Sequence, residues 1–405
     1  MATPKLKLGN DKWATKQRSL LAFNDEGNNF KSLPFNVERL SGGSYVGRNG
    51  LVQYAASEEP RIDFTNYSKG ALLLEPQRTN LKTNSEAVNN WTQSNISTST
   101  NQTTAPDGST NADKIIENSG SGSHKVYEGV STTSGQVYTW SVFLKSDTRS
   151  KVRLNIFGAY AEFDVTNQTL LTQSGITSYK IEDYGNGWGR FSITETANAS
   201  STLTYVYLLN DNGSVSYTGD GSSGLFVWGG QLEQGSYSTS YISTAGSAAT
   251  RVQEFIENRY TGLSSASGTV FIHFDTEGFD FSFAKIIALR DTATGDSLRL
   301  EPFDSSGVKK FAFFGINGFG ATPPSEDILP IGTAKKIALT FDSGNFKYAS
   351  NGVITTGTYS GTARQYNQIG GANITGGAMH NGIIQDFRIY DEVLTDAELQ
   401  TLTTL

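Results

Sequence analysis

The residues of this chain that are best suited to contact a ligand are aromatic side chains in its middle part. Sugar C–H faces stack on aromatic rings, while sugar hydroxyls take directed hydrogen bonds from amide, carboxylate or guanidinium groups. Trp140 and Trp228 alternate with apolar neighbours, which predicts that they lie in the core. The candidates for a sugar-binding platform are Trp91, Tyr160, Tyr184, Trp188, Tyr205, Tyr207 and Tyr217.

Trp188 lies in the motif Gly-Asn-Gly-Trp-Gly-Arg, residues 185–190. Glycine and asparagine favour tight turns, so the ring could sit at the tip of a loop and meet a ligand. The same motif could equally use the ring as an anchor at the start of a strand. The sequence leaves both interpretations open.

Two acidic residues, Glu162 and Asp164, lie two positions apart and so share one face of an expected strand. Paired carboxylates can carry out acid–base chemistry on a glycosidic bond. No second glutamate follows them, so we interpret the pair as a structural feature of an edge strand. For His273, one of three histidines, we expect a hydrogen-bonded or solvent-facing ring. We therefore expect no catalytic residue.

Oxygen ligands for a metal occur in turns at residues 211–213, 220–221 and 342–345. None of these turns has the alternating acidic spacing of a calcium loop, and turn formation explains their Asp-Gly and Asn-Gly chemistry. We expect no metal site and no cofactor, and leave a structural calcium as an open alternative. The chain has no cysteine, which excludes disulfides and thiolate metal sites.

Short strands separated by turns must position these side chains. The chain contains 43 Gly, 18 Tyr and 23 Phe, which favours tight turns and pleated, half-buried surfaces. In residues 137–144, Tyr138, Trp140, Val142 and Leu144 form one apolar face of an expected strand. Residues 89–104 are rich in Ser, Thr and Asn, which is typical of an exposed strand and loop or of a mobile segment.

The C-terminal part shows the same organisation. Residues 336–341 and 346–348 predict two strands joined by a hairpin turn at residues 342–345, and Asn351-Gly352 predicts a second turn. Thr395 with Glu398 three residues later predicts a capping box and a short helix.

The whole pattern predicts an all-β protein with two consecutive jelly-roll β-sandwich domains after a small irregular N-terminal segment. The expected division is residues 1–70, 71–250 and 251–405. The first segment is too small to bury a convincing core alone, so we expect it to pack against another domain, sister chains or a larger assembly.

Charge and hydropathy exclude two classes of partner. The formal net charge is −7 and the sequence has no basic stripe, which argues against nucleic acid binding. We see no secretory signal after Met1. No apolar run is long enough to span a bilayer, so we expect no membrane insertion.

Two stretches resemble known families. Residues 251–405 resemble the laminin-G-like, concanavalin A-like jelly-roll domains, through residues 335–342, 348–353 and 382–390 with the helix that follows. Residues 71–250 resemble carbohydrate-binding-like sandwich modules of bacteriophage tail-fibre and other virion surface proteins. The residues that carry this second resemblance are 70–81 (GALLLEPQRTNL), 105–109 (APDGS), 112–115 (ADKI), 185–190 (GNGWGR), 225–233 (LFVWGGQLE) and 237–251.

The resemblance implies a non-catalytic virion structural protein, either a tail or head fibre or a capsid decoration. Such a protein is made in the host cytoplasm and displays lectin-like domains on the outer surface of the virion for adhesion to host-surface polysaccharide. It also implies a homo-oligomer, expected to be a trimer, in which residues 1–70 serve attachment and oligomerisation and contact other virion proteins.

Two alternatives stay open. The first is a purely structural capsid or tail decoration protein without a specific ligand. The second is a polysaccharide depolymerase, because concanavalin-type folds also host glucanases and lyases. It is the weaker one: such glucanases carry two glutamates flanking an aspartate, and the lyases have a glutamine where Phe271 stands, two residues before His273.

Overall fold

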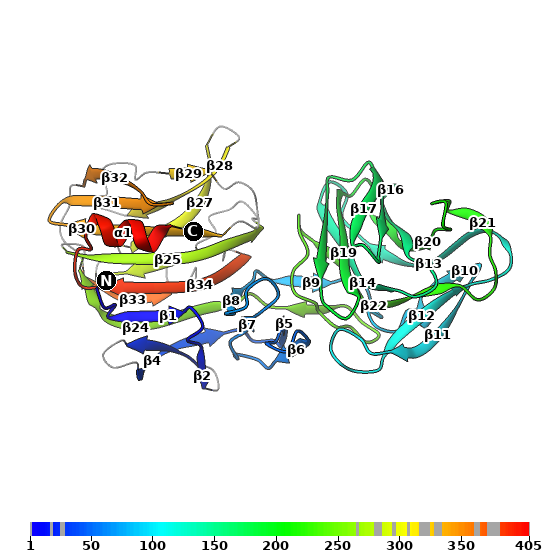
Figure 1. Cartoon of the computed structure of the whole chain (residues 1–405), viewed down its shortest axis with the longest axis horizontal. Coiled ribbons are helices and arrows are strands. Elements are labelled where there is room, and N and C mark those ends of the chain that lie inside the picture. The colour runs from blue at the N-terminus through cyan, green and yellow to red at the C-terminus, as the bar shows by residue number, and fades with distance from the viewer. Residues whose placement is uncertain are drawn as a thin grey trace. The chain divides into compact units, whose positions relative to one another are not determined.

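The computed structural model describes residues 2–16, 19–24, 29–264, 267–278, 286–293, 297–305, 308–315, 325–327, 334–359, 365–370 and 381–404. Within these ranges the regular elements are β-strands apart from one short α-helix and one 3-10 turn (Figure 1). The predicted all-β class is confirmed. The chain divides into a terminal body, Met1–Gly42, Ala55–Gln77 and Val252–Leu405, and a central body, Gly43–Tyr54 and Arg78–Arg251.

The strands of the terminal body form one 17-stranded sheet whose two halves are joined by the pairing of β3 with β4. Pairing runs through β3, β1, β34, β25, β30, β31 and β32 in one half, and through β4, β24, β33, β26, β27, β28 and β29 in the other. The elements of this body are β1 (Leu6–Gly9), β2 (Ala14–Lys16), β3 (Ser19–Asn24), β4 (Asn29–Glu38), β7 (Ile62–Asp63), β8 (Ala71–Leu74), β24 (Phe255–Ser264), β25 (Ser267–Gly278), β26 (Ile287–Arg290), β27 (Ser297–Ser305), β28 (Val308–Gly315), β29 (Ser325–Asp327), β30 (Lys335–Asp342), β31 (Asn345–Ser350), β32 (Val353–Thr358), β33 (Gln365–Gly370), β34 (Asn381–Tyr390) and α1 (Asp396–Thr403).

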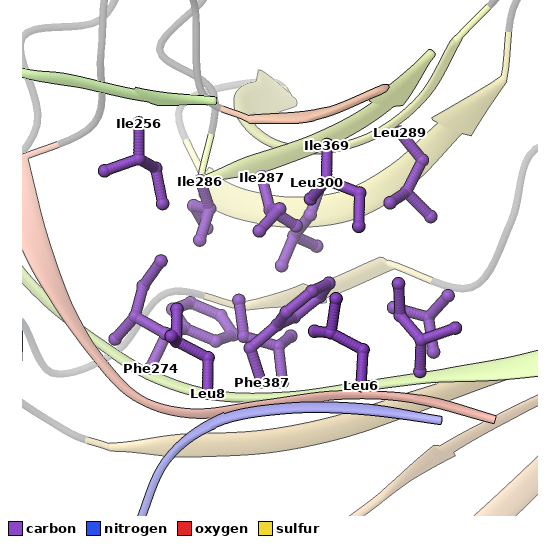
Figure 2. Close-up of a cluster of buried hydrophobic side chains, with 14 of the residues drawn as sticks. Leu6, Leu8, Ile256, Phe274, Ile286, Ile287, Leu289, Leu300, Ile369 and Phe387 are labelled. Atoms are coloured by element: carbon purple, nitrogen blue, oxygen red, sulfur yellow. The ribbon is translucent and has the colours of Figure 1, made fainter. Parts of the chain in front are cut away.

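An apolar layer fills the space between these two halves of the sheet. Figure 2 shows Leu8 and Phe387 on one side of the layer and Ile287 and Leu300 on the other. The core side chains of this layer are almost completely shielded from water, which is the main favourable contribution to folding. The predicted β-sandwich architecture is confirmed here.

The hairpin turn and the capped helix predicted in the C-terminal part are also confirmed. Ser343 and Gly344 connect β30 to β31 with φ of 48° and 93°, as a two-residue hairpin turn requires. Helix α1 begins after Thr395, whose side chain accepts from the Glu398 backbone N–H while the Glu398 side chain accepts from the Thr395 backbone N–H. Its apolar side, including Leu399, packs on the outer face of the β25-containing sheet.

The predicted N-terminal segment, residues 1–70, is not a separate unit. In the terminal body β1 pairs with β34, with Leu6 opposite Ile389 and Leu8 opposite Phe387. Most of the remaining segment also belongs to this body, and residues 43–54 belong to the central body. The expected separation of residues 1–70 was wrong, because the partner strand of β1 lies at the other end of the sequence, where a local pattern gives no sign of it. The expectation that this segment packs against another domain is confirmed by the same pairing.

A buried ionic cluster joins the same distant segments. Arg39, Arg61, Glu75 and Glu254 are all almost completely buried. Glu254 accepts hydrogen bonds from Arg39 and from Arg61, whose Nε lies 2.9 Å from Glu254 Oε1. Arg61 Nη1 lies 2.7 Å from Glu75 Oε2. Each charge is therefore matched inside the terminal body, which is the condition for burying it.

The central body is a second β-sandwich. Its front sheet has the strand order β10-β13-β20-β15-β16-β17, with β21 paired to β13, and its back sheet has the order β11-β12-β22-β14-β19-β18. The elements are β5 (Gly43–Val46), β6 (Val52–Ala55), β9 (Arg78–Asn80), η1 (Val88–Asn90), β10 (Thr92–Ser94), β11 (Ile96–Thr103), β12 (Ala112–Glu117), β13 (Ser121–Ser131), β14 (Val137–Ser146), β15 (Lys151–Ile156), β16 (Ala159–Asp164), β17 (Thr169–Ser174), β18 (Ser178–Asp183), β19 (Trp188–Thr196), β20 (Ser201–Leu208), β21 (Ser216–Thr218), β22 (Gly224–Gln234) and β23 (Ala249–Arg251).

Strand β14 confirms the alternation seen in the sequence. Tyr138, Trp140, Val142 and Leu144 lie in the core cluster of the central body, which draws on both sheets. The other face of β14 is buried too, because Phe143 packs with Trp188, Trp228 and Tyr241. Residues 89–104, left open between a strand and a mobile segment, form η1, β10 and β11.

Candidate functional site

The outer face of the front sheet carries most of the polar and aromatic candidates that remain accessible. Strand β20 alternates between buried Val206 and Leu208 and half-buried Tyr205 and Tyr207. Because side chains along a strand point to opposite faces, both tyrosines lie on the face away from the core. Leu203 is on the same face and is 39% exposed.

Strand pairing brings four tyrosines onto this face. Tyr127 lies opposite Tyr205, Tyr205 lies opposite Asn155, and Asn155 lies opposite Tyr160. One row along the strands, Lys125 lies opposite Tyr207, Tyr207 opposite Arg153, and Arg153 opposite Glu162. Four strands about 4.8 Å apart spread each row over about 14 Å. We call this set the tyrosine face: Lys125, Tyr127, Arg153, Asn155, Tyr160, Glu162, Tyr205 and Tyr207.

The rings of the tyrosine face are in mutual contact. The Tyr205 and Tyr207 rings stack with centroids 5.2 Å apart, and the Tyr127 ring lies 5.2 Å from Tyr205. The Arg153 guanidinium lies 3.8 Å from the centre of the Tyr160 ring. This packing restrains the side chains before a ligand arrives, so less conformational entropy is lost on binding.

Hydrogen-bonding groups lie among the rings. Burial raises the pKa of the Tyr205 and Tyr207 hydroxyls, and each has a neighbouring tyrosine that raises it further. Both hydroxyls therefore remain protonated at neutral pH and can donate to a ligand oxygen. Glu162 accepts from Arg153, with its Oε1 2.9 Å from the Arg153 Nε, so these two side chains are held in place. The face thus combines stacking surfaces with fixed polar groups, as sugar recognition requires.

A shallow depression continues the face toward the ends of β13 and β20. It has a volume of about 390 Å³ and is lined by Gly129, Val130, Ser131, Ser201, Thr202 and Leu203. Gly129 lies opposite Leu203, one row beyond the pair of Tyr127 and Tyr205. The depression offers hydroxyl and backbone groups beside the rings, which extends the surface that a chain-like ligand could follow.

Two of the predicted platform residues are buried. Trp91 is 2% exposed, and the Lys82 ammonium covers its ring at 3.8 Å. Trp188 is 1% exposed, and its indole N–H donates to the Thr104 carbonyl at 2.9 Å. Trp188 begins β19, so the structure has the anchor at the start of a strand rather than the loop tip. Neither ring can receive a ligand in this conformation, and both residues are corrections to the candidate set.

Tyr184 and Tyr217 lie away from the tyrosine face. The Tyr184 ring packs edge-on against Phe143 with centroids 4.8 Å apart, on the outer side of the back sheet. The Tyr217 ring contacts His124 at 4.4 Å, and its hydroxyl donates to Glu117 at 2.7 Å. Of the sequence candidates, the structure therefore brings together Tyr160, Tyr205 and Tyr207.

Both acidic side chains of the β16 pair are hydrogen-bonded within the protein. Glu162 is 8% exposed and is bonded to Arg153, and Asp164 accepts from the Asn167 backbone N–H at 3.0 Å. The expected edge position was wrong, because β16 pairs with β15 on one side and with β17 on the other. Within the described ranges, no group of three or more His, Cys, Asp or Glu side chains could hold a metal ion.

Sequence reasoning missed Tyr127, Lys125 and Arg153. Lys125 and Tyr127 alternate in β13 with buried His124 and Val126, so the period-two pattern marks them as facing outward. That they lie beside Tyr205 and Tyr207 depends on which strands pair, and the sequence pattern does not state this.

Comparison with known protein families gives a match in the terminal body. A family model described as the concanavalin A-like lectin/glucanases superfamily matches residues 258–400, about a third of the chain. No curated protein matches the chain.

Among the part of the chain that the structure describes, no helix is long and apolar enough to cross a membrane.

Solved structures show only distant likeness. Domain 4 of an extracellular arabinanase from Geobacillus stearothermophilus, in complex with arabinotriose, is 18% identical with a TM-score of 0.27, over 41% of this chain and 81% of that one. The CBM22 tandem of Paenibacillus barcinonensis Xyn10C is 11% identical with a TM-score of 0.25, over 78% and 98%. Domains LG4–5 of the mouse laminin α1 chain are 12% identical with a TM-score of 0.25, over 67% and 86%. The family match shows that residues 258–400 resemble concanavalin A-like jelly-roll domains of lectins and glucanases.

Proposed function

We propose that this protein is a non-catalytic glycan-binding protein whose central body holds a polysaccharide on the tyrosine face. The observation that carries the proposal is the gathering of Tyr127, Tyr160, Tyr205 and Tyr207 on one outer sheet face, with Asn155 between them. Rings in such a row can stack against successive sugars, while the hydroxyls and the amide bond their oxygens. In the terminal body, the match of residues 258–400 to the concanavalin A-like lectin/glucanases superfamily is consistent with a protein that acts on carbohydrate.

The setting we propose is the outer surface of a bacteriophage particle, with host-surface polysaccharide as the ligand. The support is the resemblance of residues 71–250 to virion surface modules. The chain would be made in the host cytoplasm and would assemble as a homotrimer. Attachment to other virion proteins cannot rest on a free N-terminal segment, because β1 and β4 are part of the terminal body's sheet.

The test is binding of the purified chain to polysaccharide extracted from host cells. Tyr205→Ala and Tyr207→Ala should each weaken binding about tenfold or more, which corresponds to about 1.4 kcal/mol. Tyr179→Ala is the matched control, since Tyr179 is 43% exposed and lies on β18 of the back sheet. Wild-type affinity in the Tyr205 and Tyr207 variants would refute the tyrosine face as the site.

The alternatives make different predictions for the same experiment. A purely structural decoration protein gives no saturable binding to any host polysaccharide. A depolymerase shortens the polysaccharide with time, so the size of the bound polymer is followed during incubation. The pairing of Glu162 with Arg153 favours a structural role for the acidic pair over a catalytic one.

A further inference from the structure

The tyrosine face contains one cation whose charge is not matched. The Lys125 ammonium lies 5.8, 5.2 and 5.1 Å from the ring centres of Tyr127, Tyr205 and Tyr207. All three distances are within the range of a cation–π interaction. Lys125 forms no ion pair with any carboxylate among the described residues. Its side chain is half-buried, so the charge is partly withdrawn from water.

The second cation of the tyrosine face, Arg153, is paired with a carboxylate. Arg153 lies over Tyr160 at 3.8 Å and is paired with Glu162, whose Oε1 is 2.9 Å from its Nε. The positive charge of Arg153 is therefore neutralised within the protein. The Lys125 ammonium lies near the rings of Tyr127, Tyr205 and Tyr207, and these attract a cation without neutralising it. An incoming anion would find one unpaired positive charge at the centre of the rings.

We propose that the tyrosine face selects a carboxylate-bearing polysaccharide, with the acidic group of one sugar placed at Lys125. The inference rests on the proposed function and names the class of glycan. Two rings beside Lys125 would stack sugars next to the charged one, because Tyr127 lies two residues along β13 and Tyr207 lies directly opposite on β20. Ser94, opposite Lys125 on β10, offers a hydroxyl at the same position.

The surroundings favour an acidic glycan over a polyanion in general. A single unpaired lysine supplies little affinity for a densely charged polymer, and the chain's net charge of −7 opposes one. The stacking rings and Asn155 contribute only if the ligand also has sugar faces and hydroxyls. Charge and rings together therefore specify a sugar polymer with spaced carboxylates.

The experiment compares two forms of one polymer that differ only at the carboxyl group. Polygalacturonate and its methyl ester have the same sugar rings, and esterification removes the carboxylate charge. The wild-type chain should bind the acidic form about tenfold more tightly or better, and this ratio should fall as ionic strength rises. Lys125→Met keeps the length of the side chain and should bring the ratio close to one. Lys145→Met, at a half-buried lysine on β14 of the back sheet, should leave it unchanged.

Each outcome decides between the hypotheses. Equal binding of both forms by the wild-type chain overturns the selection of acidic glycan while the proposed glycan binding stands. An unchanged ratio in Lys125→Met overturns the role of Lys125. Binding of poly-glutamate as tightly as polygalacturonate shows recognition of charge alone and also overturns the inference. Loss of binding to both polymers and to host polysaccharide overturns the proposed function itself.

Discussion

At the scale of single residues, aromatic side chains have opposite roles according to the strand face that they occupy. Trp188 and Tyr205 both lie in strands of the central body, yet Trp188 is buried and Tyr205 is half-buried on an outer face. The alternation of Tyr205 with Val206 could be read from the sequence. The burial of Trp188 could not, because the segment that covers it, including Ala105 and Tyr241, is distant in sequence.

Trp188→Ala should therefore lower stability rather than act on a ligand directly. The change leaves a cavity in the cluster with Phe143 and Trp228 and removes the hydrogen bond to the Thr104 carbonyl. We expect a loss of about 3–5 kcal/mol in the free energy of unfolding, against less than about 1 kcal/mol for Tyr205→Ala. Urea unfolding of both variants measures the difference. Equal stability of the two variants would contradict the assignment of Trp188 to the core.

His273 should make the stability of the terminal body depend on pH. Burial, together with the nearby positive charges of Lys336 and Lys69, lowers its pKa to about 4. Asp386 lies opposite on β34 but is bonded to Arg388. Histidine in an unfolded chain titrates near pH 6.5, so between pH 6.5 and 4 the unfolded state binds a proton that the folded state does not. Stability is therefore present above pH 6.5 and is lost as the pH falls toward 4.

The matching variant is His273→Gln, which cannot take up the proton. We expect it to flatten the decrease between pH 6.5 and 4, which in the wild-type chain amounts to at most about 3 kcal/mol. Urea unfolding at several pH values in this window provides the measurement. The same decrease in both proteins would show that carboxylates rather than His273 control it.

At the scale of elements, what is local in sequence was predictable. The alternation in β14, the hairpin between β30 and β31 and the capping box of α1 each depend on residues within a few positions of one another. Strand β1 has equally apolar residues, but the sheet it joins is set by β34, near the other end of the chain. Its pairing depends on the topology of the whole body, so the N-terminal segment was misjudged.

The hairpin between β30 and β31 should be sensitive to its two turn residues. Ser343 and Gly344 both have positive φ, at 48° and 93°, which glycine and asparagine adopt at little cost. Gly344→Val should lower the free energy of unfolding by about 1–2 kcal/mol. Ser343→Asn should leave it unchanged or raise it by a few tenths of a kcal/mol. Thermal unfolding followed by circular dichroism compares the two, and a destabilised Ser343→Asn variant would argue against this turn.

At the scale of the whole molecule, pairing between distant segments creates both the bodies and the candidate site. The tyrosine face needs β13, β20, β15 and β16 to pair in that order. The sequence therefore predicted three of its tyrosines as candidates, but it did not predict that they lie on one face. In the terminal body, Glu254 joins Arg39 and Arg61 across about half of the chain. The sequence shows four charged residues there, and only the fold shows that they are buried together.

Glu254→Gln tests this long-range connection. The substitution keeps the shape of the side chain but removes the charge that Arg39 and Arg61 share, leaving buried positive charge unmatched. Removing one partner of a buried ion pair costs about 3–5 kcal/mol, so the terminal body should unfold at lower urea concentration. Four of the five tryptophans, all except Trp13, lie in the central body, whereas circular dichroism reports on the strands of both bodies. We expect the variant to shift the circular dichroism transition and to leave tryptophan fluorescence and glycan binding close to wild type. Equal shifts in both signals would mean that the two bodies unfold as one cooperative unit.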